Sequence, residues 1–186
     1  PAAQALKLGP EELGRLAVPT LLYWGAHNLG GRAAGEALAA ALPPGTVANR
    51  ILVEKSQRKL TLLRDATVLK EYSVSLGKVP AGAKEREGDQ KTPEGIYRIT
   101  EHKLDSSFYR ALRVSYPEER DIERAKKAGV PPGSDIMVHG MKNGLGLIGR
   151  FHRFSDWTAG CVALTNSEIE EILAAVPNGT VIEIRP

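Results

Sequence analysis

The stretch from His139 to Asn166 reads HGMKNGLGLIGRFHRFSDWTAGCVALTN and contains the only cysteine of the chain, Cys161. The apolar run 135–140 predicts a short strand that ends in a histidine and a glycine. The run 162–164 predicts another strand, which begins directly after the cysteine. Two strand ends therefore carry a His and a Cys, joined by a long glycine-rich loop.

This pairing of residue types is suited to thiol chemistry. A nearby imidazole can take the proton of a thiol and later return it to a leaving amine. Gly160, directly before Cys161, lets a substrate approach the backbone closely, and the N–H groups there are candidates to face an oxyanion. The alternative is that Cys161 is a small buried apolar residue and His139 a hydrogen-bonded core residue.

The segment resembles the active-site signature of the L,D-transpeptidase catalytic domain family. That signature has His-Gly, a loop, Ser/Thr-His-Gly-Cys, a hydrophobic residue and a nearby Asn. The chain has His139-Gly140, then Thr158-Ala159-Gly160-Cys161-Val162, then Asn166. Two features depart from the common form, since Ala159 replaces the family's second His and the loop is long. Both resemble a branch of the family with Asp-Trp-Thr-x-Gly-Cys, which matches the Asp156-Trp157-Thr158 that precedes the motif here.

A second element supports the resemblance. Residues 88–95 read GDQKTPEG and are similar to the family's Gly-Asp-x-x-Thr-Pro-x-Gly element. From the residues alone this is a turn, because Pro93 pushes Thr92 into an extended conformation and Gly95 favours a reversal. We expect a structural role for it.

The resemblance implies specific roles. Cys161 is the expected nucleophile and His139 the expected base, with the Gly140 carbonyl orienting the imidazole and N–H groups around Gly160 and Cys161 facing the oxyanion. The substrate is a peptidoglycan stem peptide, cleaved after its third residue, a diamino acid. Carbapenem-type compounds are then expected covalent inhibitors of the same thiol.

Substrate contacts are expected from residues of the motif, of the loop and of a Ser-Tyr-Pro segment that resembles one near the family's groove. Arg150 and Arg153 are candidate partners for stem-peptide carboxylates, and His152 is a candidate replacement for the missing second His. A loop-surface position is the competing interpretation for His152. The expected set is Thr158, Arg150, Tyr116, Ser115, Asn166 and His152.

Composition limits the remaining classes. The chain has 186 residues and a formal net charge of +3, too weakly basic to indicate nucleic-acid binding but compatible with an acidic polymer. One cysteine excludes an intramolecular disulfide, and with no CxxC or HExxH we expect neither a metal nor another cofactor. No apolar run approaches the roughly 18 residues of a membrane span. Export to the periplasm or cell envelope is implied only by the resemblance.

Alternating apolar residues predict a mostly β domain over 49–186. Expected strands cover 49–55, 59–64 and 68–76 as an antiparallel meander, followed by others at 95–100, 112–117 and 180–185. With the two strands that flank the loop, about eight short strands indicate a two-sheet β-sandwich or flattened barrel. Few short helices are expected, one over 118–128 and one from Asn166 or Ser167 to Ala175.

Residues 1–48 are predicted to be a partly helical N-terminal extension. An Ala-rich run over 32–42 predicts a helix that ends at Pro43-Pro44-Gly45, and Pro10 marks a shorter helix start. His27 lies in this extension and has no chemical partner in the sequence, so we expect it at the surface.

Three functional hypotheses remain open at this point. The first is an L,D-transpeptidase that passes an acyl group from the cysteine to an amine. The second is a hydrolase of the same murein bonds, which Ala159 and the long loop favour. The third is a peptidoglycan-binding domain with an inert cysteine.

Overall fold

Three neighbouring strands open the described part of the chain, which covers residues 41–186 of a computed structural model. β1 (Arg50–Glu54), β2 (Lys59–Arg64) and β3 (Thr67–Ser73) pair in antiparallel order. β1 buries Ile51 and Val53 and β2 buries Leu60 and Leu62 at alternate positions, whereas β3 buries only Tyr72. The predicted meander is confirmed.

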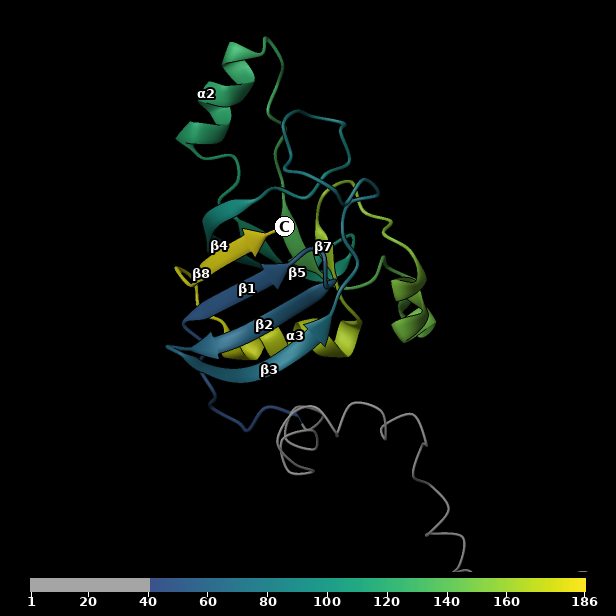
Figure 1. The fold of residues 1–186 in the computed structure, drawn as a ribbon. Coiled ribbons are helices and arrows are strands. Elements are labelled where there is room, and N and C mark those ends of the chain that lie inside the picture. Colours follow the sequence, from purple (N-terminus) through teal and green to yellow (C-terminus); the bar gives the residue numbers. More distant parts are fainter. Residues whose placement is uncertain (1–40) are drawn as a thin grey trace, which may run out of the picture. The chain divides into compact units, whose positions relative to one another are not determined.

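Eight strands form one mixed sheet in the order β3-β2-β1-β8-β4-β5-β6-β7 (Figure 1). β8 (Val181–Arg185) lies between β1 and β4 and runs parallel to β1. β6 (Met137–His139) and β7 (Val162–Ala163) form the second parallel pair. All other neighbouring strands are antiparallel. With eight strands and few short helices, the predicted mostly β class is confirmed.

The long strand β4 (Gly95–Ser106) joins the two halves of this sheet. Its first residues, Gly95–Arg98, pair with β8, and the residues from Ile99 onward pair with β5 (Tyr109–Val114). The predicted two-sheet arrangement thus takes the form of two halves that share one strand. The site described below lies in the half that ends with β6 and β7.

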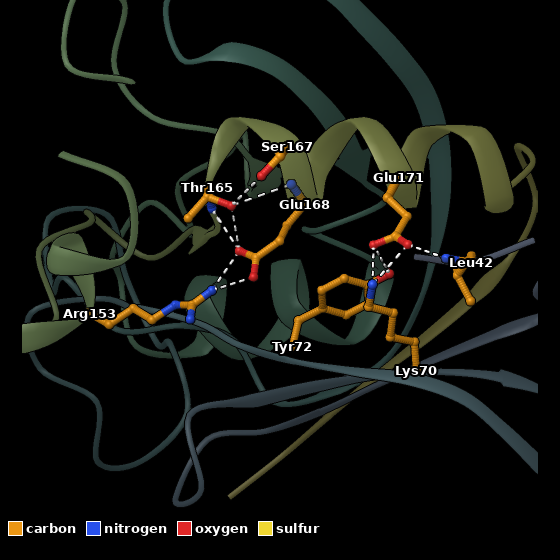
Figure 2. A network of polar contacts seen from close by, with 8 residues as sticks. All are labelled: Leu42, Lys70, Tyr72, Arg153, Thr165, Ser167, Glu168 and Glu171. Atoms are coloured by element: carbon orange, nitrogen blue, oxygen red, sulfur yellow. Dashed lines mark hydrogen bonds and ion pairs between the residues drawn. The ribbon is translucent and has the colours of Figure 1, made fainter. Parts of the chain in front are cut away.

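Helix α3 (Asn166–Ala175) contacts both halves. It packs against β5, and its apolar side chains are buried in the core. On its other side, Glu171 accepts hydrogen bonds from Lys70 at 2.7 Å and Tyr72 at 3.0 Å, both on β3 (Figure 2). Thr165 caps its first turn in a reciprocal box with Glu168. The helix predicted after the cysteine is confirmed, with the cap one residue earlier than Asn166.

The remaining helices differ in how well patterning predicted them. α2 (Glu119–Lys127) has the acidic first turn and basic last turn that were expected, and it is confirmed. The 3-10 segment η3 (Gly146–Phe154) lies in the glycine-rich loop, for which no helix was predicted. Among the described residues, no helix is both long and apolar enough to cross a membrane.

Most of the predicted N-terminal extension cannot be compared with the structure. The helix start at Pro10, His27 and nearly all of the predicted helix over 32–42 lie outside the described residues. Within the described part, the Leu42 N–H donates to Glu171 and the Ala48 N–H donates to the Ala175 carbonyl at 2.7 Å.

Candidate functional site

The parallel pair β6–β7 brings the predicted histidine and cysteine to one place. Val138 lies opposite Val162 and His139 opposite Ala163. Cys161 directly precedes β7, so it falls at the level of the residue two before His139. Because side chains two apart on a strand share a face, this register directs Cys161 and His139 to the same face of the sheet.

His139 is held in one tautomer. Its side chain is buried, and Nδ1 lies 2.7 Å from the Gly140 carbonyl oxygen. A carbonyl can only accept, so Nδ1 carries the proton and Nε2 is left with a lone pair. Burial lowers the pKa of His139 to about 4, opposed by the Gly140 hydrogen bond. The imidazole is therefore neutral at pH 7, which is the form that a general base requires.

Two aromatic rings fix the plane of this imidazole. Phe108, from the β4–β5 turn, lies with its centroid 4.6 Å from that of His139. Trp157 stands edge-on to His139 at 5.8 Å. Phe108 was not predicted as part of the site, because its contact depends on a turn that the sequence pattern did not reveal.

Cys161 is a thiol in the resting structure. Its side chain is partly exposed, and Sγ donates to the Asp135 carbonyl at 3.6 Å. Burial raises the pKa of the Cys161 thiol, and the Met137 N–H and the Lys84 charge only partly oppose it. Within residues 41–186 no hydrogen bond joins Sγ to His139. The two groups are thus neutral partners and not a preformed thiolate–imidazolium pair.

The turn before the cysteine is locked by Thr158. Its Oγ1 donates to the Cys161 carbonyl at 2.7 Å and accepts from the Gly160 N–H at 3.1 Å. Gly160 has φ +136°, and a Cβ there would lie 2.6 Å from the Lys91 carbonyl oxygen. Only glycine fits this position.

The Thr158 contacts bear on which backbone N–H groups near Cys161 are free to donate a hydrogen bond. The Gly160 N–H already donates to Thr158 Oγ1, and its predicted role toward an oxyanion stays a prediction. The Cys161 N–H has no acceptor among the described residues. Of these two amides, only that of Cys161 is left to donate to another group. Thr158 holds the turn before Cys161, and its predicted contact with substrate stays a prediction.

Asn166 fastens the start of the loop to α3. Its Oδ1 accepts from the Met141 N–H at 2.8 Å. A Cβ on Gly140 would lie 2.8 Å from that same oxygen, and one on Gly146 would lie 2.8 Å from Nδ2. Asn166 thus holds the backbone that follows the base, which explains two loop glycines. Its predicted contact with substrate stays a prediction.

His152 is buried, not on the loop surface. Its Nδ1 lies 3.1 Å from Ser75 Oγ and accepts from Trp157 Nε1 at 3.4 Å. Because the indole can only donate, the proton of the neutral ring is on Nε2, a buried atom with no hydrogen-bond partner among the described residues. Burial lowers the pKa of His152. Trp157 contacts both histidines, with its ring centroid 5.8 Å from that of His139 and 6.3 Å from that of His152.

The two arginines of η3 have different surroundings. Arg150 is exposed, as a residue that meets a substrate carboxylate would be. Arg153 is turned inward and forms an ion pair with Glu168, whose carboxylate also bonds to the Thr165 cap (Figure 2). Arg153 therefore anchors the loop to α3.

Ser115 and Tyr116 lie at the end of β5, and their polar atoms are used within the fold. Ser115 Oγ accepts from the Arg98 N–H at 3.0 Å and donates to Glu118 at 2.7 Å. The Tyr116 side chain is buried and its hydroxyl donates to the Pro132 carbonyl at 2.7 Å. Burial raises the pKa of Tyr116 to about 12. Their role as groove residues stays a prediction.

The loop 77–94 closes the site from another side, and its contacts were not predicted. A Cβ on Gly77 would lie 2.2 Å from the Gln90 carbonyl oxygen, and Gly77 N–H donates to Thr92 Oγ1 at 3.0 Å. Lys84 is buried and pairs with Asp89 at 2.8 Å. Asp89 also accepts three backbone N–H bonds. Burial raises the pKa of Asp89, but the Lys84 hydrogen bond and then these backbone bonds outweigh it and lower the pKa to about 2. The structural role expected for the 88–95 element matches these contacts.

Asp156 ties the Asp-Trp-Thr segment to the first half of the sheet. Its carboxylate accepts from Arg58 at 2.9 Å and from the Leu76 N–H at 2.9 Å. No group of three or more His, Cys, Asp or Glu side chains in residues 41–186 is arranged to hold a metal ion.

Comparison with known proteins places this site in context. The family model of the L,D-transpeptidase catalytic domain matches residues 48–184. YafK of Escherichia coli (strain K12), itself a candidate L,D-transpeptidase, is 28% identical over 137 residues, covering 70% of this chain and 48% of YafK. The chain thus spans about half the length of the curated relatives it matches.

Two solved structures share this fold with the chain. Bd1075 of Bdellovibrio bacteriovorus is 26% identical with a TM-score of 0.51, covering 79% of this chain and 52% of that one. The helical cell shape determining protein Pgp2 of Campylobacter jejuni is 23% identical with a TM-score of 0.57, covering 78% and 50%. At that identity the likeness to Pgp2 bears on the fold alone.

Proposed function

Because the chain belongs to the L,D-transpeptidase catalytic domain family, we propose that it is a cysteine-dependent L,D-transpeptidase acting on peptidoglycan. The observation that carries the proposal is the placement of Cys161 and His139 on neighbouring parallel strands, with the imidazole held so that Nε2 has the lone pair. With Nδ1 bonded to the Gly140 carbonyl, Nε2 is the ring nitrogen left free to take a proton.

The first step acylates the enzyme. Sγ of Cys161 attacks the carbonyl carbon of the diamino acid itself, in the peptide bond to the fourth residue, and its proton passes to Nε2 of His139. The Cys161 N–H faces the developing oxyanion. The C–N bond then breaks, and the imidazolium gives its proton to the departing amine, leaving a thioester on the enzyme.

The second step releases the acyl group. An acceptor amine attacks the thioester and gives a proton to His139, which returns one to the sulfur as the C–S bond breaks. With water in place of the amine, the same steps give hydrolysis. A neutral thiol beside a neutral base fits this general-base route, because the proton moves during attack and not before it.

Hydrolysis is the second candidate function. It is favoured by Ala159, which stands where the common family motif has its second histidine, and by the long loop. The third candidate, a peptidoglycan-binding domain with an inert cysteine, is favoured by the raised pKa of Cys161, since a protonated thiol is a weak nucleophile. The proposed localisation for all three is the periplasm or cell envelope, where this substrate occurs.

The test is mass spectrometry of protein and products after incubation with purified tetrapeptide muropeptides, with and without an added amine acceptor. Loss of the terminal D-alanine with a new amide to the acceptor supports transpeptidation. Loss to water alone at every acceptor concentration supports the hydrolase. No product and no adduct on Cys161 overturns both enzymatic functions, and Cys161→Ala is the matched control.

A carbapenem serves as an independent probe of the same thiol. The proposal expects an adduct of the carbapenem's mass on the wild-type chain and none on Cys161→Ala. An adduct without muropeptide turnover would keep the nucleophile but discard the proposed substrate.

A further inference from the structure

An exposed apolar patch covers the outer side of η3. Leu147 is 102% exposed, Phe154 87% and Phe151 72%, and the two phenylalanine rings stack with centroids 5.9 Å apart. We call this the η3 patch, which also includes the partly exposed Leu145 and Ile148. Apolar side chains gathered this closely on a surface mark an interaction site in most soluble proteins, whereas single exposed ones do not.

The η3 patch is held in place by the residues between its members. His152 is buried against Ser75, whose hydroxyl donates to the His152 carbonyl at 3.1 Å. Arg153 is paired with Glu168 on α3. His152 and Arg153 lie between Phe151 and Phe154 in the sequence and hold the backbone against the domain. The two phenylalanine rings on either side of them are exposed to solvent. In Figure 1 the segment is the light-green coil that projects from the body of the domain.

The charges around the η3 patch have one sign. Residues 136–155 contain Lys142, Arg150 and Arg153 but no Asp or Glu. Lys142 and Arg150 are exposed beside the patch. The nearest carboxylates along the chain and on α3 are engaged, Asp156 with Arg58 at 2.9 Å and Glu168 with Arg153. The patch therefore presents apolar side chains with a positive rim.

We propose that the η3 patch binds the surface of an anionic phospholipid bilayer. Leu147, Phe151 and Phe154 enter the boundary between headgroups and acyl chains, and Lys142 and Arg150 meet the phosphates. Short segments with Phe and Leu on one side and cations beside them bind membranes in this way, through buried apolar area and attraction to anionic lipid.

A second copy of the chain fits the η3 patch less well. A twofold contact would set the patch against itself and bring each Arg150 and Lys142 near its counterpart, with no carboxylate from residues 136–155 to compensate. A bilayer supplies the negative charge that the patch lacks. The inference does not depend on the proposed chemistry of Cys161, and it places the loop between His139 and Cys161 at a lipid surface.

The test is cosedimentation of the full 186-residue chain with vesicles of phosphatidylglycerol and phosphatidylcholine, compared with phosphatidylcholine alone, at low and high salt. We expect binding to the mixed vesicles that is at least tenfold weaker with phosphatidylcholine alone or at high salt. The Phe151→Ser/Phe154→Ser variant should lose at least tenfold in partitioning. Leu147→Gln should weaken binding, and its matched control Leu104→Gln, also an exposed leucine at 64%, should not.

Several results would overturn the proposal. One is that the wild-type chain does not bind the mixed vesicles. Another is that the phenylalanine variant, shown to be folded by circular dichroism, binds as well as wild type. A third is that the patch variants abolish a concentration-dependent dimer, or binding to purified peptidoglycan sacculi, while vesicle binding is absent. Muropeptide turnover by Phe151→Ser/Phe154→Ser in solution is a separate readout, so failure here is distinguishable from failure of the proposed chemistry.

Discussion

The Gly140 carbonyl accepts a hydrogen bond from Nδ1 of His139, at 2.7 Å. The pair are neighbours in sequence, so the bond needs no distant side chain to hold the imidazole. Asn166 fixes the backbone on the far side of Gly140 by accepting from the Met141 N–H. The orientation of the proposed base therefore depends on the main chain and on one amide at the start of α3.

Removal of either proposed catalytic side chain should abolish turnover without unfolding the chain. We expect Cys161→Ala to give no acyl-enzyme, and His139→Ala to lower kcat/KM by a factor on the order of 10³ or more, because a base within such a unit is lost. The measurement is muropeptide turnover beside thermal unfolding.

A matched control exists for the histidine. His102 is also on the sheet, and its Nε2 lies 2.8 Å from the Val176 carbonyl, away from the cysteine. His102→Ala should keep near wild-type kcat/KM. Turnover retained in His139→Ala, or lost equally in His102→Ala, would contradict the assigned role.

The pH profile of thiol alkylation should report a protonated cysteine at neutral pH. Burial raises the pKa of Cys161 and lowers that of His139 to about 4, so neither group ionises near pH 7 in the resting protein. We expect the rate with iodoacetamide to climb through pH 9 and beyond. A plateau from pH 5 to 8 would instead reveal a thiolate–imidazolium pair and require a different resting state.

Stability should fall as the solution is acidified below pH 6.5. The folded pKa of His139, about 4, lies below its unfolded value near 6.5, so the unfolded chain binds the extra proton in that interval. This group alone should lower the free energy of unfolding by about 2 kcal/mol between pH 8 and pH 5. The depressed pKa of His152 acts in the same direction.

Urea unfolding at both pH values measures the loss, and His139→Gln serves as the comparison. Because glutamine does not titrate, the variant should show a smaller drop between pH 8 and pH 5 than wild type. Equal drops would mean that the imidazole is not kept neutral by burial.

Gly160→Ala should cost far more stability than Gly179→Ala. Both glycines have positive φ, +136° and +88°, so both variants are strained. A Cβ at Gly179 meets nothing within 4 Å, whereas at Gly160 it lies 2.6 Å from the Lys91 carbonyl oxygen. We expect about 1 kcal/mol for Gly179→Ala and at least about 2 kcal/mol more for Gly160→Ala. Chemical denaturation of both variants checks this difference, and similar losses would argue against the close approach of Lys91.

Replacing each of the two arginines of η3 by methionine should affect the free energy of unfolding to different extents. Arg153→Met removes a partly buried ion pair with Glu168 and should cost about 1–2 kcal/mol, with faster proteolysis of the loop. Arg150 is exposed, so Arg150→Met should change stability by about 0.5 kcal/mol or less. Equal stability of the two variants would show that the ion pair does not anchor the loop.

Period-two alternation was enough to predict most strands, because each buries one face. It could not reveal that β1 and β8 are parallel neighbours, since pairing between residues more than a hundred positions apart leaves no local pattern. The second part of β4 was missed because residues 101–106 are largely solvent-facing and carry no apolar alternation. The helix η3 was missed because its apolar residues point to solvent, contrary to the usual pattern.

The candidate site was predictable where chemistry depends on residue type, and not where it depends on packing. His139, Gly140 and Cys161 follow from the motif. Nothing local indicated that Thr158 would occupy the Gly160 N–H, or that Phe108 would face the imidazole. These contacts come from turns and from a hairpin that only the folded chain brings together.

The central position of β8 has a consequence for biogenesis. Residues Val181–Arg185 follow every other described strand in the sequence, yet they lie between β1 and β4 and connect the β1–β3 meander to β4. Until these residues have left the ribosome, β1 and the first part of β4 have no strand between them with which to pair. This half of the sheet should therefore stay incomplete until synthesis has passed β8.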